Sequence, residues 1–261
     1  MDNLKENERI DDIEINDYKI IQKNDGFCFG IDSVLLSDFA RNIKPNSTIL
    51  DFGTGTGILG LLLIAKTKIK KVIGIEVQDE IADMARRSIK LNNLEEKFEV
   101  INTNIKELDK FLKREVYDAI ITNPPYKKIN SGLVNENKIK LISRHEIEAN
   151  LSDFIKESFK FLKDKGTLYM VHRAERLADI FYEMRKNKIE PKRIRFVYSN
   201  TQSDCKLVLI EAVKNGKSFL KIEKPLYVYD EEGKYTNEIL EIYNKKWIKI
   251  NIKWLKLIIK W

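Results

Sequence analysis

Four consecutive residues, Asn123, Pro124, Pro125 and Tyr126, follow the apolar run Tyr117–Thr122 and could activate a weakly nucleophilic nitrogen. The lone pair of an adenine N6 amino group, or of a glutamine amide, is delocalised. The Asn123 side-chain carbonyl and the Pro124 backbone carbonyl can each accept one N–H, which tilts that lone pair out of plane toward an electrophile. The prolines hold the backbone extended and remove competing donors, and Tyr126 can stack on a planar substrate. We therefore predict that these four residues are catalytic through orientation and charge placement, without a dedicated base.

A glycine-rich motif, DFGTGTG at residues 51–57, stands at the turn from a predicted strand, Thr48–Gly53, to a predicted helix, Ile58–Lys66. Glycines at such a turn let the backbone approach a ligand closely. The spacing differs from the dinucleotide pattern GxGxxG, and no Lys-Ser/Thr pair follows, which excludes a P-loop. A purely structural turn remains the alternative. The candidate cofactor-binding residues of this motif are Asp51, Gly53, Thr54, Gly55 and Gly57.

Glu76, near the end of the next predicted strand, Lys71–Val77, stands 25 residues after Asp51. An acid at this place can accept both hydroxyls of a ribose. Together with the glycine motif it resembles the S-adenosylmethionine (AdoMet) site of class I methyltransferases, and it fits a nicotinamide or flavin site less well. The resemblance predicts AdoMet as the cofactor and adds Val77, Asn104 and Asn123 to its binding residues. Asn104 stands where this fold commonly has Asp, but its side-chain carbonyl could still accept the adenine amino group.

The order of the predicted elements is that of an α/β protein, because strands alternate with helices along most of the chain. We predict a class I methyltransferase (Rossmann-like) fold, with a seven-stranded, mostly parallel sheet and an antiparallel closing hairpin. The later strands are Phe98–Asn104, Tyr117–Thr122, Gly166–Arg173, Lys192–Ser199 and Cys205–Val213. The later helices are Asp79–Asn92, Lys106–Lys113, one capped by Ser152 that runs to Lys163 with Gly166 after it, and Glu175–Lys188. Flanking elements are a strand at Tyr18–Gln22, a helix at Ile31–Asn42, an extended segment at Leu220–Asp230 and a helix starting near Asn237, while Lys127–Asn150 is predicted as a long loop.

Composition bounds the protein class. The chain has 261 residues, of which 43% are hydrophobic, so it can bury a core and is not globally disordered. Two cysteines and two histidines predict neither a disulfide framework nor a metal site. The sequence offers no signal peptide and no 18-residue apolar run, so we expect a cytoplasmic protein without a membrane span. We divide it into an acidic segment and cofactor-covering turn (1–30), a methyltransferase domain (31–215), an extended segment with a helix start (216–243) and a basic tail (244–261).

The segment from Gly26 to Leu36, GFCFGIDSVLL, precedes the two motifs and extends the resemblance. With DFGTGTG and NPPY it resembles the bacterial tRNA (adenine-37-N6)-methyltransferase family that acts on valine tRNA. Further similar segments are Asn135–Asn137, Arg144–Glu146, Val171–Arg173 and Glu190–Tyr198. The resemblance covers about residues 8–243 and implies AdoMet-dependent methylation of the adenine next to the anticodon. It places Phe27–Ser33 over the cofactor, with Phe27 and Gly30 as binding residues and Asp32 near the amino-acid end.

The net charge of +7 is unevenly distributed: residues 1–17 carry −5, residues 18–241 carry +6 and residues 242–261 carry +6. A basic balance favours a polyanionic partner. In the middle part, several bases follow NPPY, lie in the long loop or lie on later strands, and they could contact RNA phosphates around a splayed loop base. An ordinary solvated face is the alternative. The candidate nucleic-acid-binding residues are Lys127, Lys128, Arg144, His145, Arg173, Lys192, Arg193 and Arg195. We interpret His172 as a packed strand residue.

Two other functions remain open from the residues. A protein methyltransferase acting on a release-factor glutamine would use the same NPPY chemistry, although that class usually carries a longer helical domain before the sheet. A non-catalytic RNA-binding module would leave NPPY unexplained. The tail carries Trp247, Trp254 and Trp261 at a spacing of seven, which as a helix would form one stripe. That stripe could dock on the protein itself, on RNA or on anionic lipid, and we expect it to be dispensable for the chemistry.

Overall fold

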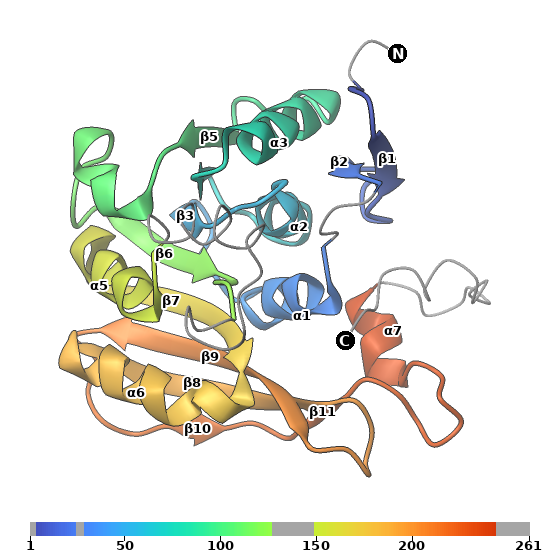
Figure 1. The fold of residues 1–261 in the computed structure, drawn as a ribbon. Coiled ribbons are helices and arrows are strands. Elements are labelled where there is room, and N and C mark those ends of the chain that lie inside the picture. The colour runs from blue at the N-terminus through green and yellow to red at the C-terminus, as the bar shows by residue number, and fades with distance from the viewer. Residues whose placement is uncertain (1–3, 25–28, 127–148, 244–261) are drawn as a thin grey trace, which may run out of the picture.

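A computed structural model describes residues 4–24, 29–126 and 149–243 of the chain. The predicted loop at Lys127–Asn150, apart from its last two residues, and the predicted tail at 244–261 lie outside the described residues. Within them the main feature is a nine-stranded sheet, drawn in Figure 1. Its strands are β3 (Thr48–Phe52), β4 (Lys71–Glu76), β5 (Phe98–Asn102), β6 (Tyr117–Thr122), β7 (Leu162–Arg173), β8 (Ile189–Tyr198), β9 (Cys205–Lys214), β10 (Lys221–Ile222) and β11 (Leu226–Tyr227).

The strand order is β10-β8-β9-β7-β6-β3-β4-β5, and β11 pairs with β8. Strands β5, β4, β3, β6 and β7 are parallel, whereas β9 runs antiparallel to both β7 and β8. The predicted seven-stranded sheet with an antiparallel closing hairpin is therefore confirmed, with β10 and β11 as two-residue additions. The parallel strands end at one edge of the sheet, which we call the carboxyl edge. The opposite edge is called the amino edge.

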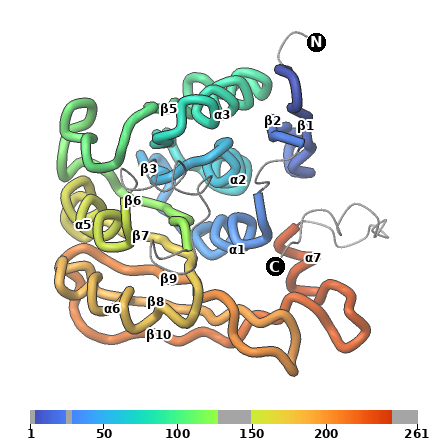
Figure 2. The backbone as a smooth tube through the Cα atoms, in the orientation of Figure 1, coloured from blue at the N-terminus to red at the C-terminus, as the bar shows by residue number. Residues whose placement is uncertain are grey.

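Helices cover both faces of the sheet, because the parallel strands bury side chains on both sides. On β3, Ile49 points into one core cluster, whereas Leu50 and Phe52 point into the other. The first cluster lies under helices α1 (Ile31–Phe39), α2 (Ile58–Lys66), α3 (Asp79–Leu91) and α7 (Asn237–Ile242). The second lies under the 3₁₀ helix η1 (Ile105–Lys110) and helices α5 (Leu151–Phe161) and α6 (Leu177–Lys186). Figure 2 shows the same sandwich as a backbone trace.

A two-stranded hairpin, β1 (Glu8–Asp12) with β2 (Lys19–Lys23), packs outside the main sheet. The predicted strand at Tyr18–Gln22 is part of it, but β1 was not predicted, because its sequence ERIDD has one apolar residue. The hairpin is fastened to α3: Arg87 makes two 2.7 Å bonds to the Glu8 carboxylate, and the Ser88 hydroxyl accepts from the Ile21 N–H at 2.9 Å. These bonds hold the hairpin against α3, beside the first half of the sheet.

Several predicted boundaries differ from the structure. The segment predicted as a helix at Lys106–Lys113 is the shorter 3₁₀ helix η1, which the Asn104 side chain caps. Helix α5 is capped by Asn150 rather than Ser152, because Asn150 and Asp153 form a reciprocal capping box. Gly166 lies inside β7, which begins directly at the end of α5. Helix α6 begins after a short 3₁₀ turn, η2 (Ala174–Arg176).

Among the described residues, no helix combines the length and apolarity needed to cross a membrane.

Candidate active site

The turn from β3 to α2 is built on three glycines in the left-handed region. Gly53, Gly55 and Gly57 have φ angles of 71°, 58° and 95°. Gly57 is the N-cap of α2, so the chain enters the helix directly from this conformation. A Cβ on Gly55 would meet no atom within 4 Å. The Gly55 backbone therefore borders empty space that a side chain would fill, as expected of a ligand cradle.

Two acidic side chains support this turn from below. Asp51 is fully buried, and its Oδ2 accepts a 2.6 Å hydrogen bond from the Thr54 hydroxyl. Its Oδ1 has no partner among the described residues. Burial raises the pKa of Asp51 to about 7, against the lowering effect of Thr54, and the nearby Glu76 charge adds to the rise. A buried oxygen without a partner behind the glycine cradle is unfavourable for the ionised carboxylate, in line with the raised pKa.

Glu76, at the end of β4, is also buried, and burial raises its pKa. Its two carboxylate oxygens accept from the Gly55 N–H at 3.1 Å and from the Gln78 N–H at 2.9 Å. A carboxylate has about four acceptor positions, so capacity remains for ribose hydroxyls. Because Glu76 also bonds the glycine turn, it couples the shape of that turn to the end of the neighbouring strand.

A cavity of about 660 Å³ opens at the carboxyl edge, beside this turn. It has the size of a small-molecule site. The predicted cofactor residues that line it are Asp32, Gly53, Thr54, Gly55, Glu76, Val77, Asn104 and Asn123. Pro124, Pro125 and Tyr126 line it as well. The structure thus brings the glycine motif, the β4 acid and NPPY to one cavity.

Three predicted cofactor residues do not line the cavity. Asp51 and Gly57 act behind the wall, through Thr54 and through the start of α2. Gly30 is the N-cap of α1, and a Cβ there would lie 2.6 Å from the Asp32 carboxylate. Phe27 lies outside the described residues. Asp51, Gly57 and Gly30 would therefore support the cofactor site indirectly, without lining the cavity. Contact of Phe27 with the cofactor stays a prediction.

Sequence reasoning predicted only part of the apolar wall of the cavity, because the resemblance placed Phe27–Ser33 over the cofactor but gave no apolar residue of the later helices. Phe29, Ile81 and Phe154 line it from the start of α1, from α3 and from α5. Phe29 belongs to the GFCFG segment, so a signal existed for it. Ile81 and Phe154 carry none, because a hydrophobic residue on a helix face is predicted as core. Apolar side chains from both faces of the sheet, together with the polar groups at the strand ends, fit a cofactor with an aromatic base and a ribose.

The NPPY residues form a hydrogen-bonded group with the start of α1. The Tyr126 hydroxyl lies 2.7 Å from Asp32 Oδ2 and 2.7 Å from Asn123 Oδ1. Asn123 Nδ2 lies 3.5 Å from the Ser33 hydroxyl. The contacts with Asp32 and Ser33 join residues 94 and 90 positions apart in the sequence. Pro124 is buried and Pro125 is exposed, so the turn presents its backbone and the Asn123 amide to the cavity.

The ring of Tyr126 packs on the end of β7. The Arg173 guanidinium lies over it at 5.3 Å, and the His172 ring lies 5.2 Å away at 58°. His172 is buried, as predicted, and burial lowers its pKa to about 4, with nearby Arg176 adding to the effect. His172 is therefore neutral near pH 7. Stacking of a substrate base on Tyr126 requires a face that Arg173 does not cover.

The predicted RNA-binding bases fall into three groups. Lys127, Lys128, Arg144 and His145 lie outside the described residues. Arg173 lies at the carboxyl edge, beside Tyr126. Lys192, Arg193 and Arg195 lie on β8, and each bonds other parts of the chain.

The β8 cations are extensively paired. Lys192 Nζ donates to the carbonyls of Lys217, Ser218 and Phe219 at 2.8–3.0 Å. Arg193 donates to the Phe39 carbonyl and pairs with Glu211 and Glu223, and Arg195 pairs with Glu238. Register places Arg193 level with Tyr169, well before the end of β7 at Arg173. The structure therefore does not bring Lys192 and Arg193 to the cavity, and their contact with RNA stays an untested prediction.

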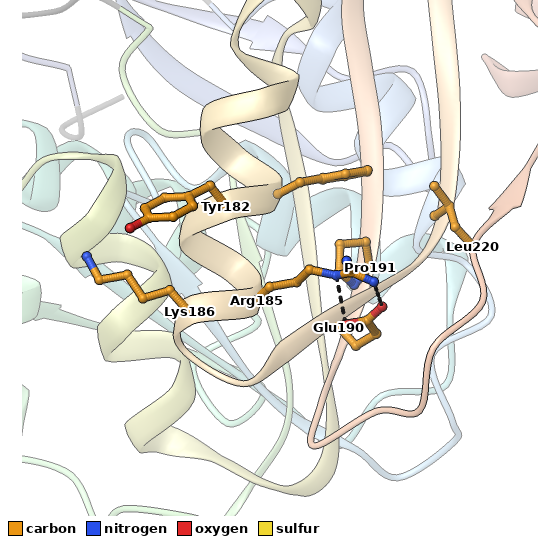
Figure 3. A pocket seen from close by; sticks show the side chains of 7 residues that line it. Tyr182, Arg185, Lys186, Glu190, Pro191 and Leu220 are labelled. Carbon is orange, nitrogen blue, oxygen red and sulfur yellow. Dashed lines mark hydrogen bonds and ion pairs between the residues drawn. The ribbon is translucent and has the colours of Figure 1, made fainter.

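A second cleft, of about 720 Å³, lies between the end of α6 and the start of β8, as Figure 3 shows. Phe181, Tyr182, Pro191 and Leu220 give it apolar walls. Because β8 runs parallel to β6, the start of β8 lies at the amino edge, away from NPPY. Its Arg185 pairs with Glu190 at 2.8 Å. It contains none of the predicted catalytic groups, so we place the active site at the carboxyl edge.

Comparison with known proteins identifies the family of the chain. The methyltransferase small domain family matches residues 29–187, which include the glycine turn, Glu76 and NPPY. The tRNA1(Val) (adenine(37)-N6)-methyltransferase of Parabacteroides distasonis is 29% identical over 210 residues, covering 78% of this chain and 86% of that protein. The protein of the same name from Pseudoalteromonas translucida is 22% identical and covers 89% and 97%. These matches confirm the resemblance stated from the motifs.

Solved structures share the fold. A predicted O-methyltransferase, Atu636 from Agrobacterium tumefaciens, superposes with a TM-score of 0.67 at 20% identity, over 82% of this chain and 96% of that chain. The TYW2 protein of M. jannaschii, solved in complex with AdoMet, gives 0.55 at 17% identity, over 80% and 87%. The predicted class I methyltransferase fold is confirmed.

Proposed function

The chain belongs to the methyltransferase small domain family, and from this premise we propose that it transfers the methyl group of AdoMet to N6 of an adenine in tRNA. The proposed target is adenine 37, in the anticodon loop of valine tRNA. The names of the similar proteins support this substrate. The observation that carries the proposal is the position of NPPY, which ends β6 and opens onto the same cavity as the glycine turn and Glu76.

The cofactor-facing residues fit AdoMet. Bound AdoMet supplies the electrophilic methyl group of a sulfonium ion. Glu76 would hold the ribose, the Gly53–Gly55 backbone would border the amino-acid part, and Asn104 would lie near the adenine. The wall formed by Ile81, Phe29 and Phe154 would exclude water from the adenine and the sulfonium.

The residues that face the methyl acceptor would orient its amino group. The Asn123 side-chain carbonyl and the Pro124 backbone carbonyl would accept the two N–H groups of adenine N6. With both hydrogens held, the nitrogen lone pair points to the methyl group, and the proton leaves to water after transfer. The base has to leave its stack to reach this cavity, which costs little in an anticodon loop. Arg173, which lies over Tyr126 at the carboxyl edge, would meet the phosphate of the extruded nucleotide.

The decisive experiment incubates the protein with methyl-labelled AdoMet and total tRNA, then maps the modified nucleoside. We expect N6-methyladenosine at position 37 of valine tRNA. Label at another tRNA position would overturn the specific target. Label in protein rather than RNA would favour the release-factor type of glutamine methyltransferase.

Replacement of Asn123 tests the mechanism. Asn123→Ala should lower the rate of methyl transfer by about 100-fold to 1000-fold, because one of two orienting acceptors is lost. Its tRNA affinity should remain within about twofold of wild type, since phosphates supply most of that affinity. Asn187→Ala is the matched control, because Asn187 only caps α6 by a bond to the Glu183 carbonyl. Full activity in Asn123→Ala would show that the amide does not orient the substrate.

A further inference from the structure

The hydroxyl of Tyr126 faces two oxygen atoms at the same distance. It lies 2.7 Å from Asp32 Oδ2 and 2.7 Å from Asn123 Oδ1, yet it carries one proton. A carboxylate is a stronger acceptor than an amide carbonyl, so the Tyr126 hydroxyl donates its hydrogen bond to Asp32. The lone pair of the Tyr126 oxygen then faces the Asn123 amide, where it needs a donor.

Asn123 can supply that donor by a half-turn of its amide. A half-turn exchanges the amide oxygen and nitrogen almost without moving other atoms, so a short contact to a hydroxyl oxygen selects the NH₂ group. We propose that Asp32 is a positioning residue that acts through Tyr126 on Asn123. The resulting chain runs from the Asn123 amide N–H to the Tyr126 oxygen, and from the Tyr126 O–H to the Asp32 carboxylate.

This chain decides where the Asn123 carbonyl points. With NH₂ turned to Tyr126, the carbonyl oxygen is released from the hydroxyl and faces the side of Ser33, which also lines the cavity. Ser33 Oγ lies 3.5 Å from that end of the amide, too far to hold it firmly. The carbonyl is therefore available to accept an N–H of the substrate. Without Asp32, the Tyr126 proton would compete with the substrate for the same oxygen.

The surroundings favour a fixed chain rather than a mobile one. Asp32 Oδ1 accepts from the Ser33 N–H at 3.0 Å, at the start of α1, so the carboxylate is held in place. The ring of Tyr126 is packed between His172, Arg173 and the cavity. Burial and the Asp32 charge raise the pKa of Tyr126, so its hydroxyl stays protonated and does not act as a base. In this hydrogen-bonded chain, Asp32 therefore stays an acceptor and the Tyr126 hydroxyl stays a donor.

The proposal rests on the function proposed above, because it concerns the amide that orients the acceptor nitrogen. It is tested by a double-mutant cycle with Asp32→Asn, Tyr126→Phe and the pair together. Tyr126→Phe keeps the ring and removes the hydroxyl, and Asp32→Asn keeps the shape and removes the charge. Each single variant should lower kcat about tenfold with KM for tRNA unchanged, the loss expected for one hydrogen bond to a charged group. The double variant should lose about tenfold, not about 100-fold.

A second measurement needs neither cofactor nor substrate. In ¹⁵N-labelled protein, the side-chain amide resonance of Asn123, assigned by its absence in Asn123→Ala, should shift in Tyr126→Phe and in Asp32→Asn. The pair should give no further shift. Ser33→Ala is the matched control, because it removes the 3.5 Å contact and should move that resonance little.

The outcomes separate the two proposals. If wild-type protein methylates a protein instead of tRNA, the proposed substrate fails, and the cycle is measured on the protein substrate. If losses in kcat multiply, or if the Asn123 resonance ignores Asp32→Asn, then Asp32 does not act through Tyr126 and the positioning role is wrong. If Asp32→Asn weakens binding of S-adenosylhomocysteine equally with and without the Tyr126 hydroxyl, and kcat at saturation is unchanged, Asp32 serves the cofactor alone.

Discussion

The two halves of the sheet use their polar residues in opposite ways. In the half formed by β3, β4 and β5, the groups at the strand ends face the cavity: Gly55 borders open space, and the Glu76 carboxylate accepts from N–H groups of the neighbouring turns. In the half that contains β8, the cations are turned inward. Arg193 is bonded to a carbonyl of α1 and to two carboxylates, and its guanidinium lies 3.8 Å from the Phe39 ring centre.

The difference teaches that a motif defined by backbone geometry is a safer guide to a site than a cluster of charges. A glycine turn carries its function in local φ and ψ angles, which neighbouring residues set. The role of an arginine depends on which acceptors the fold brings to it from elsewhere. For Arg193 these come from positions 39, 211 and 223, far from it in the sequence.

The largest effect should come from the glycine turn. Gly55→Val puts a branched side chain at a φ of 58° and into the space that borders the cavity, so S-adenosylhomocysteine should bind about 1000-fold more weakly by calorimetry, or about 4 kcal/mol. Gly233→Val is the matched control. Gly233 has a φ of 74° with no atom near its Cβ position, but it lies outside the cavity. It should lose stability by a similar backbone strain of about 1–3 kcal/mol and keep cofactor affinity. If both variants bound S-adenosylhomocysteine equally weakly, Gly55 would not be part of the cofactor site.

A smaller effect should follow from Arg193→Met. Loss of this half-buried cation removes the ion-pair partner of Glu211 and leaves Glu223 with the 3.7 Å contact to Lys221, so the free energy of unfolding in urea should fall by about 3 kcal/mol. The tRNA affinity of the folded variant should stay within about twofold of wild type. Arg185→Met is the control, because Arg185 is 63% exposed and solvent screens its pair with Glu190, so the variant should change stability little. Weaker tRNA binding with unchanged stability would mean that β8 does face RNA.

The smallest effect concerns the buried acid under the glycine turn. Burial raises the pKa of Asp51 from its ordinary value of 3.8 to about 7, so the folded state binds the proton more tightly. Stability from this group is present below pH 4 and is lost as pH rises to 7 and above. Asp51→Asn keeps an acceptor for Thr54 and removes this loss. In cofactor-free protein it should be more stable than wild type by about 2 kcal/mol at pH 8, and by little at pH 4.

Asp118→Asn should change the stability in the opposite direction to Asp51→Asn. Burial acts to raise the pKa of Asp118, but hydrogen bonds from Lys163 and from the Thr48 N–H lower it overall. Its contribution is present at neutral pH and is lost as pH falls, so the variant should be less stable than wild type at pH 8. Urea denaturation at the two pH values checks both. A stability difference for Asp51→Asn that does not change with pH would contradict the buried, strained carboxylate.

Much of the fold was predictable because its local signals agree. The apolar runs at β3 and β6, each ended by a turn motif, gave correct strands, and α2 was predicted with its actual bounds. The errors arose where a partner outside the segment decides the structure. Strand β1 exists because Arg87 and β2 pair with it, and α5 starts at Asn150 because Asp153 completes the capping box.

The candidate site divides in the same way. The glycine turn, Glu76 and NPPY could be placed at one edge from sequence, since parallel strands end together. The contact of Tyr126 with Asp32 could not, because no spacing rule relates residues 94 positions apart. The apolar wall at Ile81 and Phe154 was equally hidden, since helix-face residues of this type are predicted as core.

The central position of β3 also has a consequence for synthesis. β3 pairs with β4 on one side and with β6 on the other. As the chain leaves the ribosome, β4 and β5 follow β3 and emerge before β6. One hydrogen-bonding edge of β3 therefore stays unpaired until Tyr117–Thr122 has been made. An unpaired edge of apolar strand attracts other extended chains. The nascent half formed by β3, β4 and β5 therefore passes through a stage with an exposed strand edge. The arrival of β6 pairs that edge of β3 in the same step that delivers Asn123 and Tyr126 to Asp32.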